Sequence, residues 1–148
     1  MDRAKKASSM IAERKGNCAQ SVFTAFSSGF GLDEKTAFNI TQAFGGGMNM
    51  NSICGAVTGA CMALGLADPV SKENPRQSMD KAKFLQAEFN RRFIEIHGGL
   101  TCTELLGYNL TDPEEAAKAK ESGLFVTKCP VFVGDAVKIV EELLEQGK

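Results

Sequence analysis

Apolar residues recur at helical spacing along most of this chain, and glycines, prolines and capping residues separate the segments. Residues 2–15 carry apolar side chains three and four positions apart between charged ones, which predicts an amphipathic helix. Asn17 is followed three residues later by Gln20, the pattern of a capping box, so a second helix is expected over residues 18–28. Caps and apolar periodicity predict further helices in the same way. They cover residues 33–44, 52–66, 75–97, 101–106, 112–122 and 130–146.

These segments predict an all-α fold, a single compact orthogonal bundle of about six to eight helices. A chain of 148 residues fits one domain, which we expect to span residues 1–148. No segment has a convincing strand pattern, because the β-branched stretch at residues 125–133 contains Pro130. Residues 52–66 are small and apolar on most sides, so this helix should lie at the centre.

Composition and charge exclude several classes of function. Hydrophobic residues make up 43% of the chain, enough for a core, and charged residues 24%. The net charge is −1 and the basic residues are dispersed, so we expect neither a nucleic-acid partner nor an anionic membrane surface. No apolar run reaches the ~18 residues of a membrane span. The first fifteen residues are charged and lack the apolar core of a signal peptide, which predicts a cytoplasmic protein.

The placement of the cysteines is the most informative feature. Cys18 and Cys102 each follow a predicted helix cap, Cys54 lies two residues after the predicted cap Ser52, and Cys129 occupies a cap position itself. Helix starts offer unpaired N–H donors and the positive end of the helix dipole, which favour the thiolate. Thiolate is the form that attacks disulfides and ligates metals. In a reducing compartment, spaced cysteines more often bind metal or carry out redox chemistry than form structural disulfides.

Cys61 differs from the other four, because it falls in the middle of a predicted helix. It lies about 10.5 Å beyond Cys54 along a straight helix. Two sulfur ligands of one zinc ion lie less than ~4 Å apart, so this pair should not share an ion, and Cys61 is interpreted as a small buried hydrophobe. No C-x-x-C pair is present, so the fold would have to gather Cys18, Cys54, Cys102 and Cys129. Inert buried thiols are the alternative.

Other residues near these cysteines admit two interpretations each. Gly55 and Gly59 share a helix face, where they either let another backbone approach or contact a bound cofactor. Met48 and Met50 offer soft sulfur ligands of the kind copper(I) takes, and packing is the simpler explanation. His97 ends a helix, where a charged imidazole would interact well with the helix C-terminus. With one histidine and no paired carboxylates, an acid–base enzyme is not indicated.

The string at residues 45–59, GGGMNMNSICGAVTG, resembles the central signature of the redox-active family called C_GCAxxG_C_C. That family is named for one cysteine, a block of Cys, Gly and Ala followed by x-x-Gly, and two more cysteines. Cys18 matches the first cysteine and Cys54 the block. Cys102, within HGGLTCTELLG, and Cys129, within KCPVFV, match the other two, so the resemblance covers nearly the whole chain. The block here reads Cys-Gly-Ala, where the family label spells Gly-Cys-Ala.

This resemblance implies that the four matching cysteines are redox thiols or metal ligands. A related domain occurs in split-Soret cytochromes, for which an iron–sulfur centre held by cysteines has been proposed, so electron transfer through an iron–sulfur cluster or another thiolate-bound metal is the first hypothesis. A metal-free thiol–disulfide protein is the second. The third is a non-catalytic binding module, stabilised by zinc or free of metal. The expected partner is a redox protein or a small thiol. A homodimer is compatible with the sequence and is not established by it.

Overall fold

The computed structural model describes residues 2–68 and 72–147, and these residues are predominantly helical. The helices are α1 (Arg3–Ala12), α2 (Cys18–Ser27), α3 (Glu34–Ile40), α4 (Gly55–Leu66), α5 (Pro75–His97), α6 (Cys102–Leu106), α7 (Pro113–Glu121), α8 (Leu124–Thr127) and α9 (Cys129–Gln146). Short turns η1 (Ser28–Phe30), η2 (Gln42–Phe44) and η3 (Gly47–Asn51) lie between them. Within the described ranges the only strand-like pairing is one isolated bridge, between Ile53 and Thr101. The prediction of an all-α fold is confirmed.

Local capping signals place several helix starts where the sequence predicted them. Asn17 and Gln20 form the complete capping box that opens α2. Thr101 and Glu104 form a second one, which opens α6. The longest helix, α5, has the predicted bounds, with proline in its first turn and Gly98 in the left-handed conformation after its end.

Some boundaries differ from the prediction for identifiable reasons. The helix expected over residues 2–15 ends at Ala12, because Arg14 takes a left-handed φ of 57°. The helix expected over residues 33–44 ends at Ile40, and the turn η2 follows it. Helix α8 was not predicted, because its four residues are too few to display a period.

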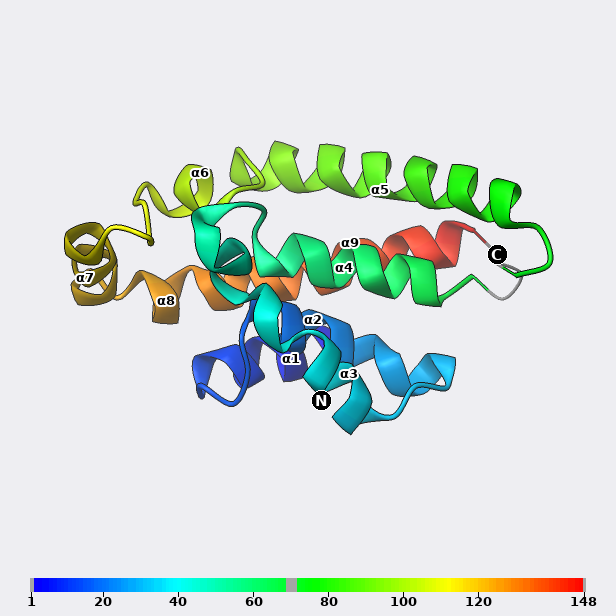
Figure 1. Cartoon of the computed structure of the whole chain (residues 1–148), viewed down its shortest axis with the longest axis horizontal. Coiled ribbons are helices and arrows are strands. Elements are labelled where there is room, and N and C mark those ends of the chain that lie inside the picture. The colour runs from blue at the N-terminus through cyan, green and yellow to red at the C-terminus, as the bar shows by residue number, and fades with distance from the viewer. Residues whose placement is uncertain (1, 69–71, 148) are drawn as a thin grey trace.

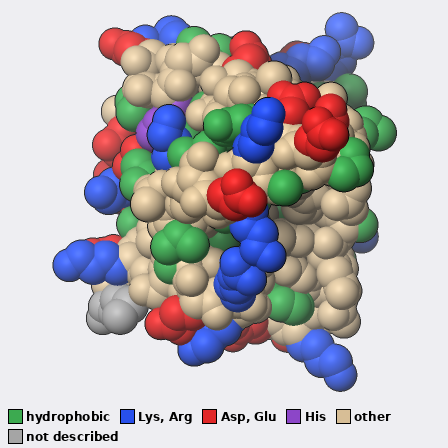
Figure 2. All heavy atoms as spheres, turned by 90° about the vertical axis from the view of Figure 1, so that its left-hand side faces the viewer, with side chains coloured by type: hydrophobic (Ala, Val, Ile, Leu, Met, Phe, Trp, Pro, Cys, Tyr) green, Lys and Arg blue, Asp and Glu red, His purple; other side chains and the backbone are tan. Residues whose placement is uncertain are grey.

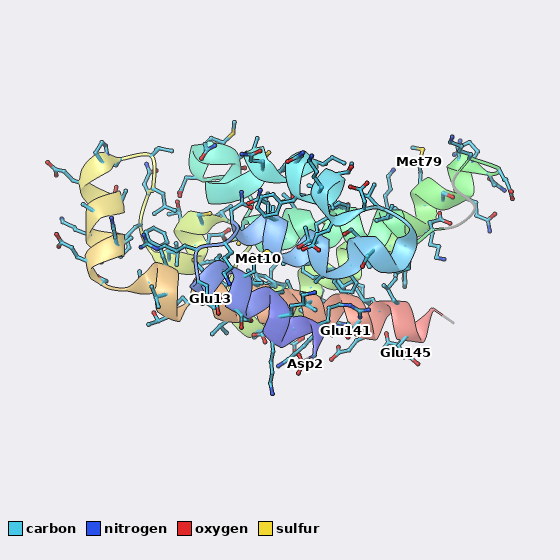
Figure 3. The ribbon with its side chains drawn as sticks, turned by 90° about the horizontal axis from the view of Figure 1, so that it is seen from below. Asp2, Met10, Glu13, Met79, Glu141 and Glu145 are labelled. Carbon is cyan, nitrogen blue, oxygen red and sulfur yellow. The ribbon has the colours of Figure 1, made fainter. Side chains whose placement is uncertain are left out.

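Helix α4 lies at the centre of the arrangement, as its apolar composition predicted. It packs against α2, α9 and α5, and its small residues are largely buried. Figure 1 shows α4, α5 and α9 running alongside one another, with α6, α7 and α8 gathered at one end of the molecule. Helix α1 packs against α9 and α2, and Figure 3 shows it lying obliquely over α9. Helices α6, α7 and α8 thus form the connection between the end of α5 and the start of α9.

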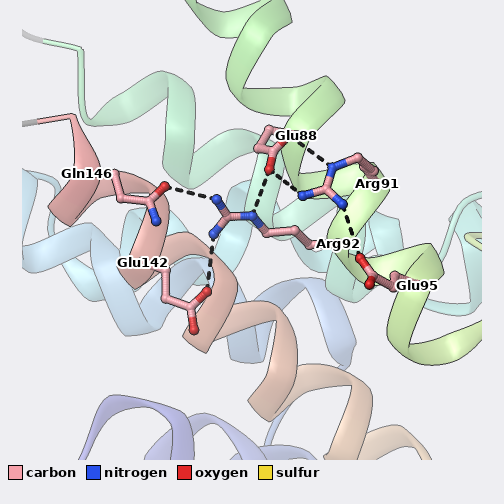
Figure 4. A network of polar contacts seen from close by, with 6 residues as sticks. All are labelled: Glu88, Arg91, Arg92, Glu95, Glu142 and Gln146. Atoms are coloured by element: carbon pink, nitrogen blue, oxygen red, sulfur yellow. Dashed lines mark hydrogen bonds and ion pairs between the residues drawn. The ribbon is translucent and has the colours of Figure 1, made fainter.

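A polar network joins α5 to α9 on the surface (Figure 4). The guanidinium of Arg92 donates hydrogen bonds to Glu88 at 2.9 Å, Glu142 at 3.2 Å and Gln146 at 2.9 Å. Arg91 pairs with Glu88 at 2.7 Å and with Glu95 at 3.1 Å. Hydrogen bonds from Arg91 and Arg92 lower the pKa of Glu88 to about 2. The carboxylate of Glu88 thus stays charged down to acidic pH.

His97 closes the last turn of α5 against α9. Its ring lies 4.7 Å from the ring of Phe93 and 4.9 Å from that of Phe132, measured between centroids. Its Nε2 atom lies 2.9 Å from Oδ2 of Asp135 on α9. These contacts of His97 link the C-terminal end of α5 to the first two turns of α9.

No helix in the described part of the chain is both long enough and apolar enough to cross a membrane. On the face seen in Figure 2, acidic and basic side chains are interspersed with hydrophobic ones. The acidic and basic side chains on this face are intermixed, as the even spread of charged residues along the sequence predicted.

Candidate functional site

Four cysteines line one cavity of about 350 Å³ near the junction of α2, α4, α6 and α9. Cys54, Cys102 and Cys129 are buried, Cys18 is half-buried, and all four are free thiols. The thiol of Cys18 interacts by hydrogen bonding with those of Cys129 and Cys54, and Cys54 interacts in the same way with Cys102. Cys102 also interacts electrostatically with Cys129, so each of the four thiols is linked to two of the others. The fold brings together the four cysteines that the sequence singled out.

Each of these cysteines lies at the start of a helix, although two of the predicted positions were wrong. Cys18 and Cys102 are the first residues of α2 and α6, as predicted. Cys54 is itself the N-cap of α4, not a residue two places inside a helix capped by Ser52. Cys129 is the first residue of α9, not its cap, because Lys128 takes the cap position directly after α8. Both corrections keep the sulfur at the positive end of its helix.

A long-range pairing positions Cys54 beside Cys102. The amide of Cys54 donates to the carbonyl of Leu100 at 2.8 Å, and the amide of Cys102 donates to the carbonyl of Ser52 at 3.1 Å. Ser52 is drawn into this pairing, which explains why it does not cap α4. These two hydrogen bonds join the segment before α4 to the segment before α6. Ile53 and Thr101 lie opposite each other between the bonds, and each is followed directly by one of the two cysteines.

The loop before this pairing has an uncommon backbone. Residues 46–49 all have φ between 57° and 63°, a left-handed turn that includes the non-glycine residues Met48 and Asn49. Asn51 is also left-handed, at φ 58°. Its side-chain amide bonds Oγ1 of Thr103, and its Oδ1 accepts from the amide of Leu110 at 3.1 Å. Asn51 was not among the residues predicted from the sequence to matter for the site. Its position in a glycine-rich segment was the one indication, because asparagine adopts the left-handed conformation more readily than most residues.

Gly55 and Gly59 lie against α2. A Cβ atom on Gly55 would come within 2.8 Å of the amide nitrogen of Ala19 and 2.9 Å of Cβ of Cys18. One on Gly59 would come within 2.9 Å of the carbonyl oxygen of Ala19. The two glycines therefore permit α2 and α4 to approach closely, and this approach brings the first residue of α2 to the cap of α4. Neither glycine is among the described residues that line the cavity.

The thiols differ in their protonation. Hydrogen bonds from Cys102 and Cys18 hold the pKa of Cys54 well below that of an ordinary thiol, and the amides of Ala56 and Val57 at the start of α4 lower it further. The pKa of Cys18 is raised well above the ordinary value by its interaction with Cys129, and that of Cys102 by its interaction with Cys54. The arrangement favours one thiolate, on Cys54, among protonated neighbours.

Cys61 lies apart from this group. It borders a different cavity, between α4 and α5, and Nε2 of Gln86 lies 3.6 Å from its sulfur. Burial raises the pKa of the Cys61 thiol, so it lacks the activation found at Cys54. This residue therefore offers a natural control for experiments on the other four.

Four thiols are a suitable donor set for iron or zinc. In the described ranges, however, no three Cys, His, Asp or Glu side chains are placed to hold one metal ion between them. The site thus has the chemistry of a thiolate centre without the geometry of a preformed single-ion site.

Two comparisons found nothing and one found a family. No curated protein and no solved structure matches the chain. A family described as "Putative redox-active protein (C_GCAxxG_C_C)" matches residues 16–143, a range that contains all four cysteines of the cavity.

Proposed function

The chain belongs to the C_GCAxxG_C_C family, and from this premise we propose that Cys18, Cys54, Cys102 and Cys129 form a redox centre that carries electrons. One observation supports the proposal most strongly. Four thiols from four separate helix starts line the same cavity. Burial of four thiols in an inert core would need neither this convergence nor the activation of one of them.

We propose a thiolate-held iron–sulfur cluster as the group that carries the electrons. All four cysteines are available as ligands, and α2, α4 and α9 point their positive ends toward them, which offsets the negative charge of thiolates. A cluster distributes its ligands over several iron atoms, so it does not require three side chains around one point, whereas a structural zinc ion does. When bound, such a cluster supplies one-electron transfer.

The test is an analysis of iron and acid-labile sulfide in protein purified without oxygen, together with its visible absorption. We expect both elements and a visible chromophore in the wild type and in Cys61→Ser. Cys54→Ser should lose them, because it removes the thiol that contacts both Cys18 and Cys102. Protein that contains zinc alone, or a Cys54→Ser variant that keeps its iron and sulfide, would contradict the proposal.

The lowered pKa of Cys54 supports a second candidate, metal-free thiol–disulfide exchange. A thiolate is the attacking form, and Cys54 interacts directly with Cys18 and Cys102, either of which could complete a disulfide. In that reaction the Cys54 thiolate attacks the disulfide of a partner, and the second thiol then displaces the partner: one S–S bond forms in this protein, the partner's S–S bond breaks, and the partner takes up two electrons and two protons. This candidate predicts iron-free protein that is oxidised reversibly. Peptide mapping should find Cys54 in the disulfide, and Cys61→Ser should behave as the wild type.

A further inference from the structure

The cavity extends well beyond the four sulfur atoms. Its volume of about 350 Å³ falls in the range of small-molecule sites, roughly 300–1,000 Å³. Most of the remaining lining is apolar and comes from α1, α6, α8 and α9. The largest of these side chains are Ile11, Leu105, Leu106, Phe125, Val126 and Phe132. The thiols thus share their cavity with an apolar surface suited to a hydrophobic molecule.

The electrostatics of this cavity favour a ligand that becomes negative. Arg14 is the one charged residue among the described residues of the lining, which include no carboxylate. Its exposed side chain has no ion-pair or hydrogen-bond partner within residues 2–68 and 72–147, and its left-handed backbone ends α1 at the cavity. Three helices of ten residues or more, α2, α4 and α9, begin at the cavity, whereas one helix of that length, α1, ends there. The positive ends therefore outnumber the negative ones.

We infer that the cavity binds a quinone, a neutral apolar electron acceptor whose carbonyl oxygens gain negative charge on reduction. This inference rests on the proposed function, because the electrons come from the redox centre. Reduction of the quinone takes two electrons and two protons and gives two hydroxyl groups. If two thiols are the donor, they supply both electrons and both protons and form one disulfide. If the centre delivers single electrons, two deliveries and two protons from solvent complete the reaction.

Duroquinone is the probe, because its four methyl groups block addition of thiols to the ring. Binding of oxidised duroquinone to the full-length protein is measured by anaerobic equilibrium dialysis. Val126 borders the cavity and is 57% exposed, so Val126→Glu places a charge in the apolar lining at little risk to folding. Val131 is 51% exposed and does not border the cavity, so Val131→Glu is the matched control. Val126→Glu should weaken binding by about tenfold or more, and Val131→Glu should leave it unchanged.

Electron transfer is measured separately. Protein is reduced with dithionite, freed of the reagent and mixed with duroquinone in a single turnover. The wild type should form one hydroquinone per two electrons delivered, which means one per protein if two thiols are the donor and one per two proteins if the centre holds a single electron. Arg14→Gln should bind the neutral quinone as well as the wild type does, and should reduce it about threefold more slowly, because it lacks the charge that stabilises the reduced form. Lys15→Gln, which changes an exposed neighbouring charge outside the cavity, should have no effect.

These measurements separate the two proposals. If the redox centre is present and duroquinone does not bind, or if Val126→Glu and Val131→Glu behave alike, the quinone site is refuted and the redox centre stands. If duroquinone binds and the reduced protein passes no electrons to it, the role of electron acceptor is refuted. If the protein has neither a cluster nor reversible thiols, the proposed function fails whatever binds in the cavity.

Discussion

Helix α4 contains two glycines at which the same substitution should have opposite effects. Gly59 faces α2, and a Cβ atom there would lie 2.9 Å from the carbonyl oxygen of Ala19 and 3.1 Å from Cβ of Val22. Gly65 is exposed, and a Cβ atom there would meet no atom within 4 Å. Gly59→Ala should therefore destabilise the protein, and Gly65→Ala should stabilise it.

The magnitude follows from the two terms that alanine introduces. Both variants gain helix propensity, about 1 kcal/mol, and this term cancels when they are compared. Gly59→Ala alone also forces α2 away from α4, and overpacking of this kind costs about 1–3 kcal/mol. The two variants should therefore differ in the free energy of unfolding by about 1–3 kcal/mol. At about 2–4 °C per kcal/mol for a chain of this size, Tm should differ by several degrees.

Urea unfolding of both variants and the wild type provides the assay, with m-values compared to confirm that the same surface unfolds. Since α2 begins with Cys18, Gly59→Ala should also disturb the proposed redox centre, while Gly65→Ala should not. Equal stability of the two variants, or a Gly59→Ala protein more stable than the wild type, would refute close packing of α2 against Gly59.

Three further predictions concern protonation and backbone strain. The rate of iodoacetamide labelling of Cys54 in reduced, metal-free protein should rise less steeply with pH than that of Cys61, because the pKa of Cys54 is lowered and that of Cys61 is raised. The rates are measured by mass spectrometry, and equal slopes would contradict this. Glu88→Gln should lower the urea midpoint at neutral pH. Because the pKa of Glu88 falls from 4.5 to about 2 on folding, its stabilisation is present above pH 4.5 and is lost as pH falls through 2, so the wild-type and variant midpoints should draw together over this range and meet near pH 2. A constant difference would count against the network. In urea unfolding, the free energy of unfolding of Asn51→Ala should be about 1 kcal/mol lower than that of Asn51→Gly, because glycine adopts the left-handed backbone without strain and alanine does not. The reverse order would exclude that strain.

The parts of the fold that could be predicted from the sequence depend on neighbours within a turn or two. The capping boxes at Asn17 and Thr101 each join residues three apart, so their helix starts were predicted correctly. Ser52 was assigned as a cap for the same kind of reason and was wrong. Its amide is bonded to the carbonyl of Gly47, and its carbonyl accepts from the amide of Cys102, which lies fifty residues later in the chain (102 minus 52). No local pattern reveals that competitor.

The candidate site shows the same division. The position of each cysteine near a helix start could be predicted locally, whereas their convergence was implied only by the resemblance to a family. The close approach of α2 to α4 depends on what faces Gly55 and Gly59, and glycine in a helix has the same appearance in a sequence whether it faces a neighbour or solvent. Arg14 and the apolar lining could not be associated with the cysteines, because residues from α1, α6, α8 and α9 meet there only after folding.

Since Cys18 opens α2 and Cys129 opens α9, the four sulfurs can meet only after residues 18–129 have been synthesised and docked. A chain truncated before α6 lacks Cys102 and Cys129, and it therefore lacks the larger of the two thiol interactions that lower the pKa of Cys54. The proposed redox centre would therefore report on folding, because only a chain whose tertiary structure has formed would show its redox signature.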